Sequence, residues 1–201
     1  WVLASKFGFP AAAGAGPNRQ GQSRKWITQS LEASLRRLGT DYLDILYFHR
    51  ALTDVTLEEG LRAIDDLIRQ GKLRYYGVSN FHGWRIADVV RMADQLGMPR
   101  PVASEPLYNI VDRKAEVEQL PAAFHLGLGS VSYSPLARGV LSGKYAPDAP
   151  PPADSRAGRG DKRIAQTEWR PESLRIAQAV AAHAAARGTT PVAFALAWVL
   201  H

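Results

Sequence analysis

The chain has 201 residues, enough for one domain with a substantial core, and its apolar content of 46% argues against wholesale disorder. Its net charge of +6 comes partly from residues 154–163, where no aromatic residues are interleaved, so we expect no nucleic-acid partner. The absence of cysteine excludes disulfides and thiol chemistry and fits a reducing cytoplasm. The longest apolar run, residues 192–200, is about half of the ~20 residues that a membrane helix needs, so we expect no membrane segment.

Apolar runs typical of strands alternate with helical patterns along the chain. Strands are predicted to end near residues 5, 48, 78, 107 and 134. Helices are predicted over residues 23–38, 56–71, 84–96, 114–126, 172–187 and 191–200, with a kink at Pro121 in the fourth. Thr56 and Glu59 have the spacing of a capping box, Gly39 is a stop signal, and Thr190 is the expected cap of the last helix.

Five β-α units predict parallel strands joined by right-handed crossovers. Gly14-Ala15-Gly16 is a weak signal for a phosphate loop, because it lacks a third glycine and an immediately following helix. No glycine-rich dinucleotide fingerprint follows a strand. The chain opens directly in a strand at Trp1 and ends in or just after a helix, which favours part of a barrel over an open doubly wound sheet. We therefore expect an α/β fold: an incomplete (β/α)8 TIM barrel with about five strands, in a single domain over residues 1–201.

Residues 146–171 hold five prolines and form a long polar connection. Connections of this length in compact domains are usually functional or mobile. Two interpretations stay open for this segment: a clasp over a cofactor, or a surface loop.

Polar residues follow the apolar runs at each predicted strand end. In a barrel, the carboxyl ends of all strands lie on one rim, where active sites are built. Each residue alone has an ordinary structural explanation, but together they indicate a site. The residues are Lys6, His49, Ser79, Asn80, Glu105, Tyr108, Asn109, Tyr133 and Ser134.

These residue types suit a nicotinamide dinucleotide. A lysine and a histidine without metal-ligand spacing suggest acid–base chemistry. Serine, asparagine and carboxylate side chains can hydrogen-bond a planar amide, and a tyrosine can stack on a flat ring. Ser134, followed by Pro135 and Leu136, can offer a hydroxyl and backbone amides to phosphate.

At these positions the chain resembles the aldo-keto reductase family, over nearly its whole length. Within the family, the similarity is to the bacterial branch that resembles potassium-channel β subunits. The segments that carry the resemblance are ASKFG at 4–8, SLRRLGTDYLD at 34–44, FHR at 48–50, GKLRYYGVSNF at 71–81 and YSPLARGVLSGKY at 133–145.

The resemblance implies a barrel enzyme that uses NADP(H) to reduce a small-molecule carbonyl substrate, an aldehyde or a ketone, to an alcohol. Lys6 and His49 match the family's catalytic lysine and histidine. Ser79 and Asn80 match the pair that binds the nicotinamide carboxamide, and Tyr133 matches the ring-stacking aromatic. The pyrophosphate loop corresponds to Ser134, Leu136, Gly139 and Lys144.

The resemblance also implies that the family's catalytic aspartate and tyrosine precede the first strand of this chain. In the family's reaction, a hydride reaches the carbonyl carbon while the tyrosine protonates the oxygen, and the lysine lowers the pKa of that tyrosine. The chain alone is therefore expected to be inactive and, with two open strand edges, to fold poorly. An oligomer is compatible with the sequence.

Glu105 departs from the family, which usually has a glutamine at this position. A carboxylate can only accept hydrogen bonds, whereas a glutamine also donates. Glu105 can therefore accept from the amide of the nicotinamide, and its charge favours the oxidised, cationic ring.

Two other functions stay open. Channel-associated relatives retain the cofactor but act chiefly as regulatory subunits, so a non-catalytic nicotinamide-cofactor-binding subunit is one alternative. A generic phosphate-binding barrel is the other, and it would be favoured if no nicotinamide cofactor binds. An aspartate followed about five residues later by a tyrosine, upstream of this stretch, would support an enzyme.

Overall fold

The computed structural model describes residues 1–14 and 16–201. It divides into two compact units: unit 1 comprises Trp1–Pro106 and Glu116–Val131, and unit 2 comprises Leu107–Ala115 and Ser132–His201. The stretch Gly14-Ala15-Gly16, considered above as a phosphate loop, includes position 15, which lies outside the described residues. Among the described residues, no helix is both long enough and apolar enough to cross a membrane.

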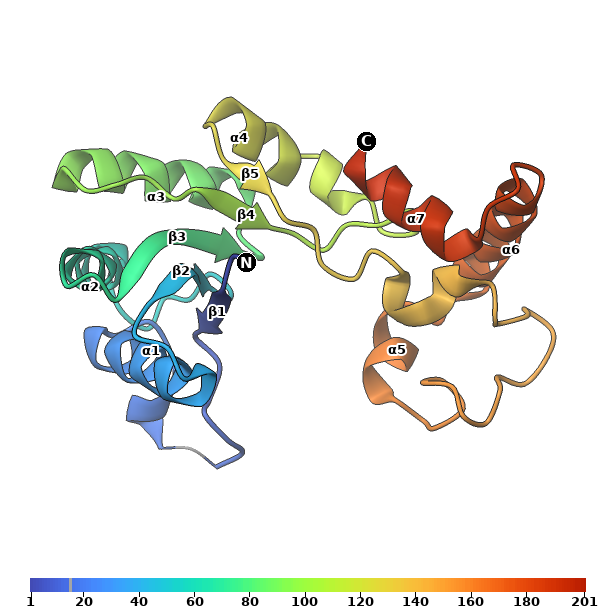
Figure 1. Ribbon diagram of the computed structural model, residues 1–201, viewed down its shortest axis with the longest axis horizontal. Coiled ribbons are helices and arrows are strands. Elements are labelled where there is room, and N and C mark those ends of the chain that lie inside the picture. The colour runs from blue at the N-terminus through green and yellow to red at the C-terminus, as the bar shows by residue number, and fades with distance from the viewer. Residues whose placement is uncertain (15) are drawn as a thin grey trace. The chain divides into compact units, whose positions relative to one another are not determined.

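Unit 1 contains a parallel sheet of five strands in the order β1-β2-β3-β4-β5. Because consecutive strands are neighbours, right-handed crossovers bring the connecting helices to one face of the sheet (Figure 1). In the part of the chain that the structure describes, the sheet does not close. The predicted α/β fold with five parallel strands of an incomplete barrel is confirmed. The strands are β1 (Ala4–Phe7), β2 (Leu43–Phe48), β3 (Leu73–Ser79), β4 (Ala103–Glu105) and β5 (Gly129–Ser130).

Side-chain caps begin two helices of unit 1, and the predicted signals at Thr56 and Gly39 are confirmed. The side chain of Ser23 accepts from the backbone N–H of Trp26, and Thr56 accepts from that of Glu59. Gly39 ends the first helix in a left-handed conformation. The helices are the 3₁₀ helix η1 (Pro17–Arg19), then α1 (Arg24–Leu38), α2 (Leu57–Arg69), α3 (Gly83–Leu96) and α4 (Gln119–His125); η2 (Lys114–Glu116) links the units.

Side chains alternate between the two faces of the sheet. The face turned to the helices is apolar and packs against their apolar stripes in one core. Strand residues in this core include Phe7, Leu46, Phe48, Tyr76 and Val78.

The opposite face carries residues predicted at the site. Lys6 pairs in register with Tyr47, Tyr47 with Gly77, and Ser79 with Glu105. Since the period is two, Gly77 and Ser79 point the same way, and all five residues share this face. The register of four strands therefore determines which polar residues can meet.

Three predicted elements differ from the structure. The kink at Pro121 is wrong, because the segment forms two short helices and Pro121 lies in the first turn of α4, where a missing N–H is tolerated. The fourth strand is only three residues long. The fifth ends at Ser130, so placing Tyr133 at a strand end is wrong: Tyr133 forms an isolated bridge with Leu107.

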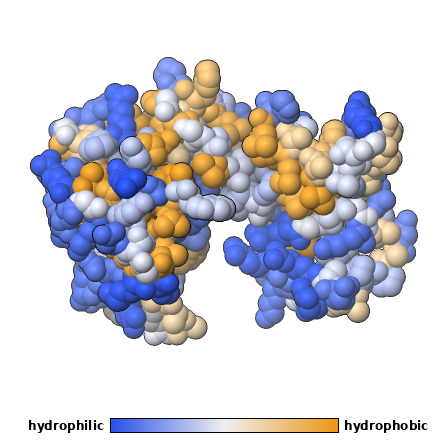
Figure 2. Space-filling view, in the orientation of Figure 1, coloured by the Kyte–Doolittle hydropathy of each residue, from blue (hydrophilic) through white to orange (hydrophobic). Residues whose placement is uncertain are grey.

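Unit 2 is helical, with a core of its own. Residues 146–171, expected to be a long loop, contain a helix, and Ser155, Ile164 and Glu168 in this segment are buried. Figure 2 shows hydrophilic residues gathered over the region of this helix. The elements of unit 2 are the 3₁₀ helix η3 (Ala137–Ser142), α5 (Lys162–Thr167), α6 (Pro171–Ala185) and α7 (Pro191–Leu200).

Gly77 is a testable determinant of this sheet. A Cβ at this position would lie 2.5 Å from the ring of Tyr47 and 2.7 Å from the carbonyl oxygen of Ala103. We predict that Gly77→Ala lowers the free energy of unfolding by about 1–3 kcal/mol, measured by urea denaturation. Gly129→Ala is the matched control, because the nearest atom to its new Cβ would be 3.6 Å away. Equal stability of the two variants would contradict the packing described for Gly77.

Candidate functional site

Lys6 and Glu105 form an ion pair on the face of the sheet that is turned away from the helices. The Lys6 Nζ lies 2.9 Å from the Glu105 Oε1. Glu105 is only 7% exposed, and its other oxygen, Oε2, is buried without a hydrogen-bond partner. Because a carboxylate oxygen only accepts hydrogen bonds, this atom suits a ligand that brings an N–H or O–H donor.

The carbonyl oxygen of Glu105 connects the pair to the ends of two other strands. It accepts hydrogen bonds from the Ser79 Oγ (3.0 Å) and the Asn80 backbone N–H (3.3 Å). The Asn80 Nδ2 donates to the carbonyl of His49 (2.8 Å) and to the Ser79 Oγ (3.0 Å). Asn80 has a φ of 59°, a left-handed conformation that asparagine tolerates better than most residues. The structure thus joins Lys6, His49, Ser79, Asn80 and Glu105 into one network.

His49 immediately follows β2, beside the aromatic ring of Phe9. The two ring centroids are 4.4 Å apart, edge to face. The backbone N–H of His49 donates to the carbonyl of Phe7, which extends the pairing of β1 with β2. Lys6 and His49 also line one groove of about 1110 Å³ that runs along α1. A small molecule in this groove can therefore reach both side chains.

Tyr47 contacts the candidate site, and sequence reasoning missed it because it lies within an apolar run. The Lys6 Nζ is 5.5 Å from the centroid of its ring, and Tyr47 is buried. Burial, and then the negative charge of Glu105, raise the pKa of Tyr47. Tyr47 therefore stays uncharged, and its ring packs against the ammonium group of Lys6. Its position two residues before His49, on the same face of β2, was the available signal.

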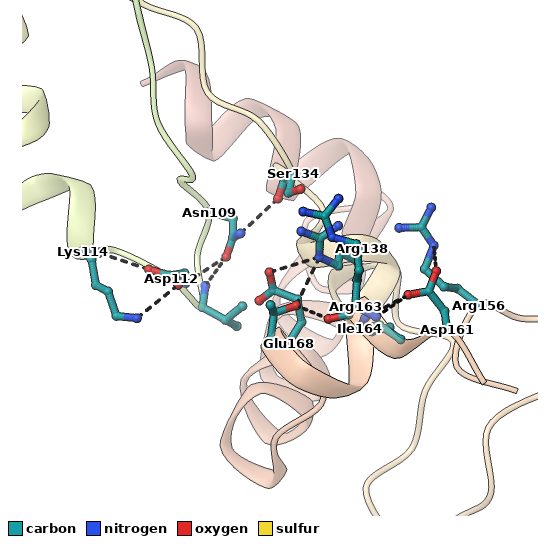
Figure 3. Close-up of polar contacts among 12 residues, drawn as sticks. Asn109, Asp112, Lys114, Ser134, Arg138, Arg156, Asp161, Arg163, Ile164 and Glu168 are labelled. Carbon is teal, nitrogen blue, oxygen red and sulfur yellow. Dashed lines mark hydrogen bonds and ion pairs between the residues drawn. The ribbon is translucent and has the colours of Figure 1, made fainter. Parts of the chain in front are cut away.

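A second group of predicted residues lies in unit 2, in the loop over residues 134–144. Ser134, Ala137 and Arg138 have φ angles of 56°, 48° and 55°, which are left-handed and unfavourable for residues with a Cβ. The buried Asn109 stabilises the start of this loop, because its Nδ2 donates to the carbonyl of Ser134 (3.0 Å; Figure 3). Tyr133, at the entrance of the loop, is half-buried and accepts a backbone hydrogen bond from Tyr108 (3.5 Å).

This loop forms part of a positively charged cavity of about 460 Å³. A Cβ on Gly139 would lie 3.3 Å from the Nζ of Lys144, so the ammonium group lies against the backbone of the loop. Four lining residues are basic and one is acidic, which favours an anion. The lining residues are Ser134, Pro135, Leu136, Arg138, Gly139, Lys144, Asp154, Ser155, Arg156 and Arg159.

Part of the 146–171 segment contributes residues to the lining of this cavity. Sequence reasoning left open whether this segment is a clasp over a cofactor or a surface loop. Arg156 and Arg159 are exposed and also line the cavity, and Arg156 pairs with Asp161 (3.7 Å; Figure 3). The predicted residues therefore form two groups, one in each unit.

The whole chain, residues 1–201, matches the model of the Aldo/keto reductase family. Two proteins named "Probable voltage-gated potassium channel subunit beta", from Oryza sativa subsp. japonica and Arabidopsis thaliana, are each 38% identical over 187 residues, which cover 92% of this chain and 57% of theirs. A Schizosaccharomyces pombe protein named "Putative voltage-gated potassium channel subunit beta" is 35% identical over 204 residues, covering 100% of this chain and 58% of its own.

The chain spans a little over half the length of these relatives. Its parallel strands, the polar residues at their carboxyl ends and the match along the whole chain agree with one another. The chain belongs to the aldo/keto reductase family, and it is similar to members named as potassium-channel β subunits.

Proposed function

We propose that the protein is an NADP(H)-dependent oxidoreductase that reduces aldehydes or ketones to alcohols. The observation that carries this proposal is the network of Lys6, His49, Ser79, Asn80 and Glu105 at the carboxyl ends of parallel strands, where barrel enzymes build their active sites. NADP(H), when bound, supplies the hydride.

The buried polar atoms of unit 1 fit the amide of a nicotinamide. The Oε2 of Glu105 lacks a donor, and a carboxamide NH₂ would satisfy it. The hydroxyl of Ser79 already donates to Glu105, so towards a ligand it acts as an acceptor. We assign Ser79, Asn80 and Glu105 to the carboxamide and Tyr133 to stacking on the ring.

The loop of unit 2 fits the phosphates of the cofactor. Lys144 lies against the left-handed turn around Gly139, and Arg156 and Arg159 add positive charge to the same cavity. We assign Ser134, Leu136, Gly139 and Lys144 to the pyrophosphate, with the two arginines as additional charge partners.

Lys6 and His49 are the proposed catalytic residues. Lys6 is anchored by Glu105 and supported by the ring of Tyr47, so its ammonium has a defined position beside the groove. In that position, its positive charge would stabilise the phenolate of the catalytic tyrosine that the family resemblance implies, and so assist proton transfer to the carbonyl oxygen of the substrate. His49 lines the same groove and can orient the carbonyl by a hydrogen bond.

A second candidate is a non-catalytic, cofactor-binding regulatory subunit. It is favoured by the names of the relatives from rice, Arabidopsis and fission yeast. Mixing the NADPH-loaded protein with a panel of aldehydes and ketones separates the two functions. Carbonyl-dependent loss of NADPH absorbance supports the oxidoreductase, whereas stable binding without oxidation supports the regulatory subunit. The absence of cysteine supports a cytoplasmic location for either.

Lys6→Met tests the catalytic assignment in the full-length protein. We predict that kcat falls by roughly 10²- to 10⁴-fold, the usual contribution of acid–base catalysis, while the Kd for NADPH changes far less. Lys72→Met is the control, because Lys72 also pairs with a glutamate, Glu32, but immediately precedes β3 and so lies at the opposite end of the strands. Unchanged turnover in Lys6→Met would sink the assignment.

Glu105→Gln tests the role of the buried carboxylate. Removing its charge should raise the affinity for NADPH relative to NADP⁺ by roughly three- to tenfold, because the carboxylate favours the cationic ring while Lys6 moderates its charge. Fluorescence titration with both cofactor forms gives the ratio of the two Kd values. Glu32→Gln provides a control for the loss of a glutamate charge in unit 1. An unchanged ratio in Glu105→Gln would refute this role.

A further inference from the structure

Arg138 has an unusual backbone conformation within the loop proposed to bind the pyrophosphate. Its φ and ψ are 55° and 22°, and the preceding residue, Ala137, is also left-handed. Two consecutive non-glycine residues in this region cost free energy and persist only when surrounding contacts impose them. The side chain of Arg138 shows what imposes this conformation.

Arg138 reaches the C-terminal end of α5. Its Nε donates to the Oγ1 of Thr167 (3.2 Å) and lies 3.9 Å from the Oε1 of Glu168 (Figure 3). The side chains of Arg138 and Glu168 are 14% and 4% exposed, so the pair is largely removed from water. Beside it, the rings of Tyr145 and Trp169 are in edge-to-face contact at 4.9 Å. Arg138 within the loop and Tyr145 directly after it are thereby both in contact with residues 167–169.

The surroundings of Glu168 do not favour its charged form. Burial raises the pKa of Glu168, and nearby Asp112 adds to the effect, while Arg138, Arg170 and Lys114 oppose it. Its Oε1 has no hydrogen-bond partner. A buried carboxylate in these surroundings costs more to ionise in the folded than in the unfolded protein. Its contact with Arg138, at 3.9 Å, is what connects this carboxylate to the loop.

We propose that Glu168 is a positioning residue which, through Arg138, holds the loop over residues 134–144 in the conformation that binds the pyrophosphate of the cofactor. The proposal deepens the proposed function and rests on it. Glu168 itself does not line the cavity, whereas Arg138 does. The pair therefore acts on the backbone of the loop, and through it on the position of Lys144.

Glu168→Gln removes the charge and keeps the shape of the side chain. Hydrogen exchange of the cofactor-free protein should become faster in the loop, and the Kd for NADPH should rise by roughly five- to tenfold, with little change in kcat at saturation. Glu172→Gln is the matched control: Glu172 also pairs with an arginine, but both side chains are about 70% exposed, so neither readout should change.

The pH dependence of stability separates positioning from a merely structural role. A raised pKa means that the folded protein binds more protons than the unfolded protein, so this glutamate makes stability fall as the pH rises through its folded pKa. The glutamine variant lacks this fall. We therefore expect Glu168→Gln to gain stability relative to wild type as the pH rises, while its affinity for NADPH is reduced.

Three results would count against the account, and they are distinguishable. If Glu168→Gln is less stable than wild type at alkaline pH and also binds NADPH less tightly there, Glu168 is structural and the positioning role is overturned. Unchanged loop exchange in Glu168→Gln would overturn that role alone. Absence of NADPH binding by the wild-type protein would instead overturn the proposed function, since the exchange measurement needs no cofactor.

Discussion

The ion pair between Lys6 and Glu105 depends on the register of the whole sheet. Lys6 is on the first strand and Glu105 on the fourth, and the two intervening strands place Tyr47 and Gly77 on the same face. Gly77 leaves room for the ring of Tyr47, and that ring lies beneath the lysine. A one-residue slip of any of these strands would turn its polar side chain into the core. The register of the strands therefore determines both the packing of the apolar core and the placement of the polar side chains on the opposite face of the sheet.

The loop of unit 2 meets a different requirement. Phosphate binding, the role proposed for this loop, needs backbone turns that most residues disfavour, and the loop has left-handed φ angles at three non-glycine residues, Ser134, Ala137 and Arg138. Each end of that stretch has its own anchor: Asn109 at Ser134, and the end of α5 at Arg138. The 146–171 segment contributes both an anchor and basic residues to the cavity. Ser155, Ile164 and Glu168 bury this segment in unit 2, while its prolines and most of its polar residues stay at the surface.

Local signals predicted much of this fold, and long-range partners were beyond them. Thr56, Gly39 and Thr190 delimit helices through contacts within a few residues, so a sequence pattern suffices to find them. The apolar runs located the strands, but the pairing of β4 with β5 ends at Ser130 and returns only as an isolated bridge between Leu107 and Tyr133, so β5 is shorter than predicted. Likewise, Glu105 was singled out as a departure from the family, but its pairing with Lys6, ninety-nine positions away, emerges only from the sheet.

The central claim is that this chain has a site for a nicotinamide dinucleotide. Equilibrium titration of the wild-type protein with NADPH, followed by the fluorescence of the cofactor, tests it most directly. The account predicts saturable binding of one NADPH per chain, with inorganic pyrophosphate competing because it occupies the basic cavity lined by Lys144. Fluorescence that rises only in proportion to added NADPH, without saturation, would contradict it.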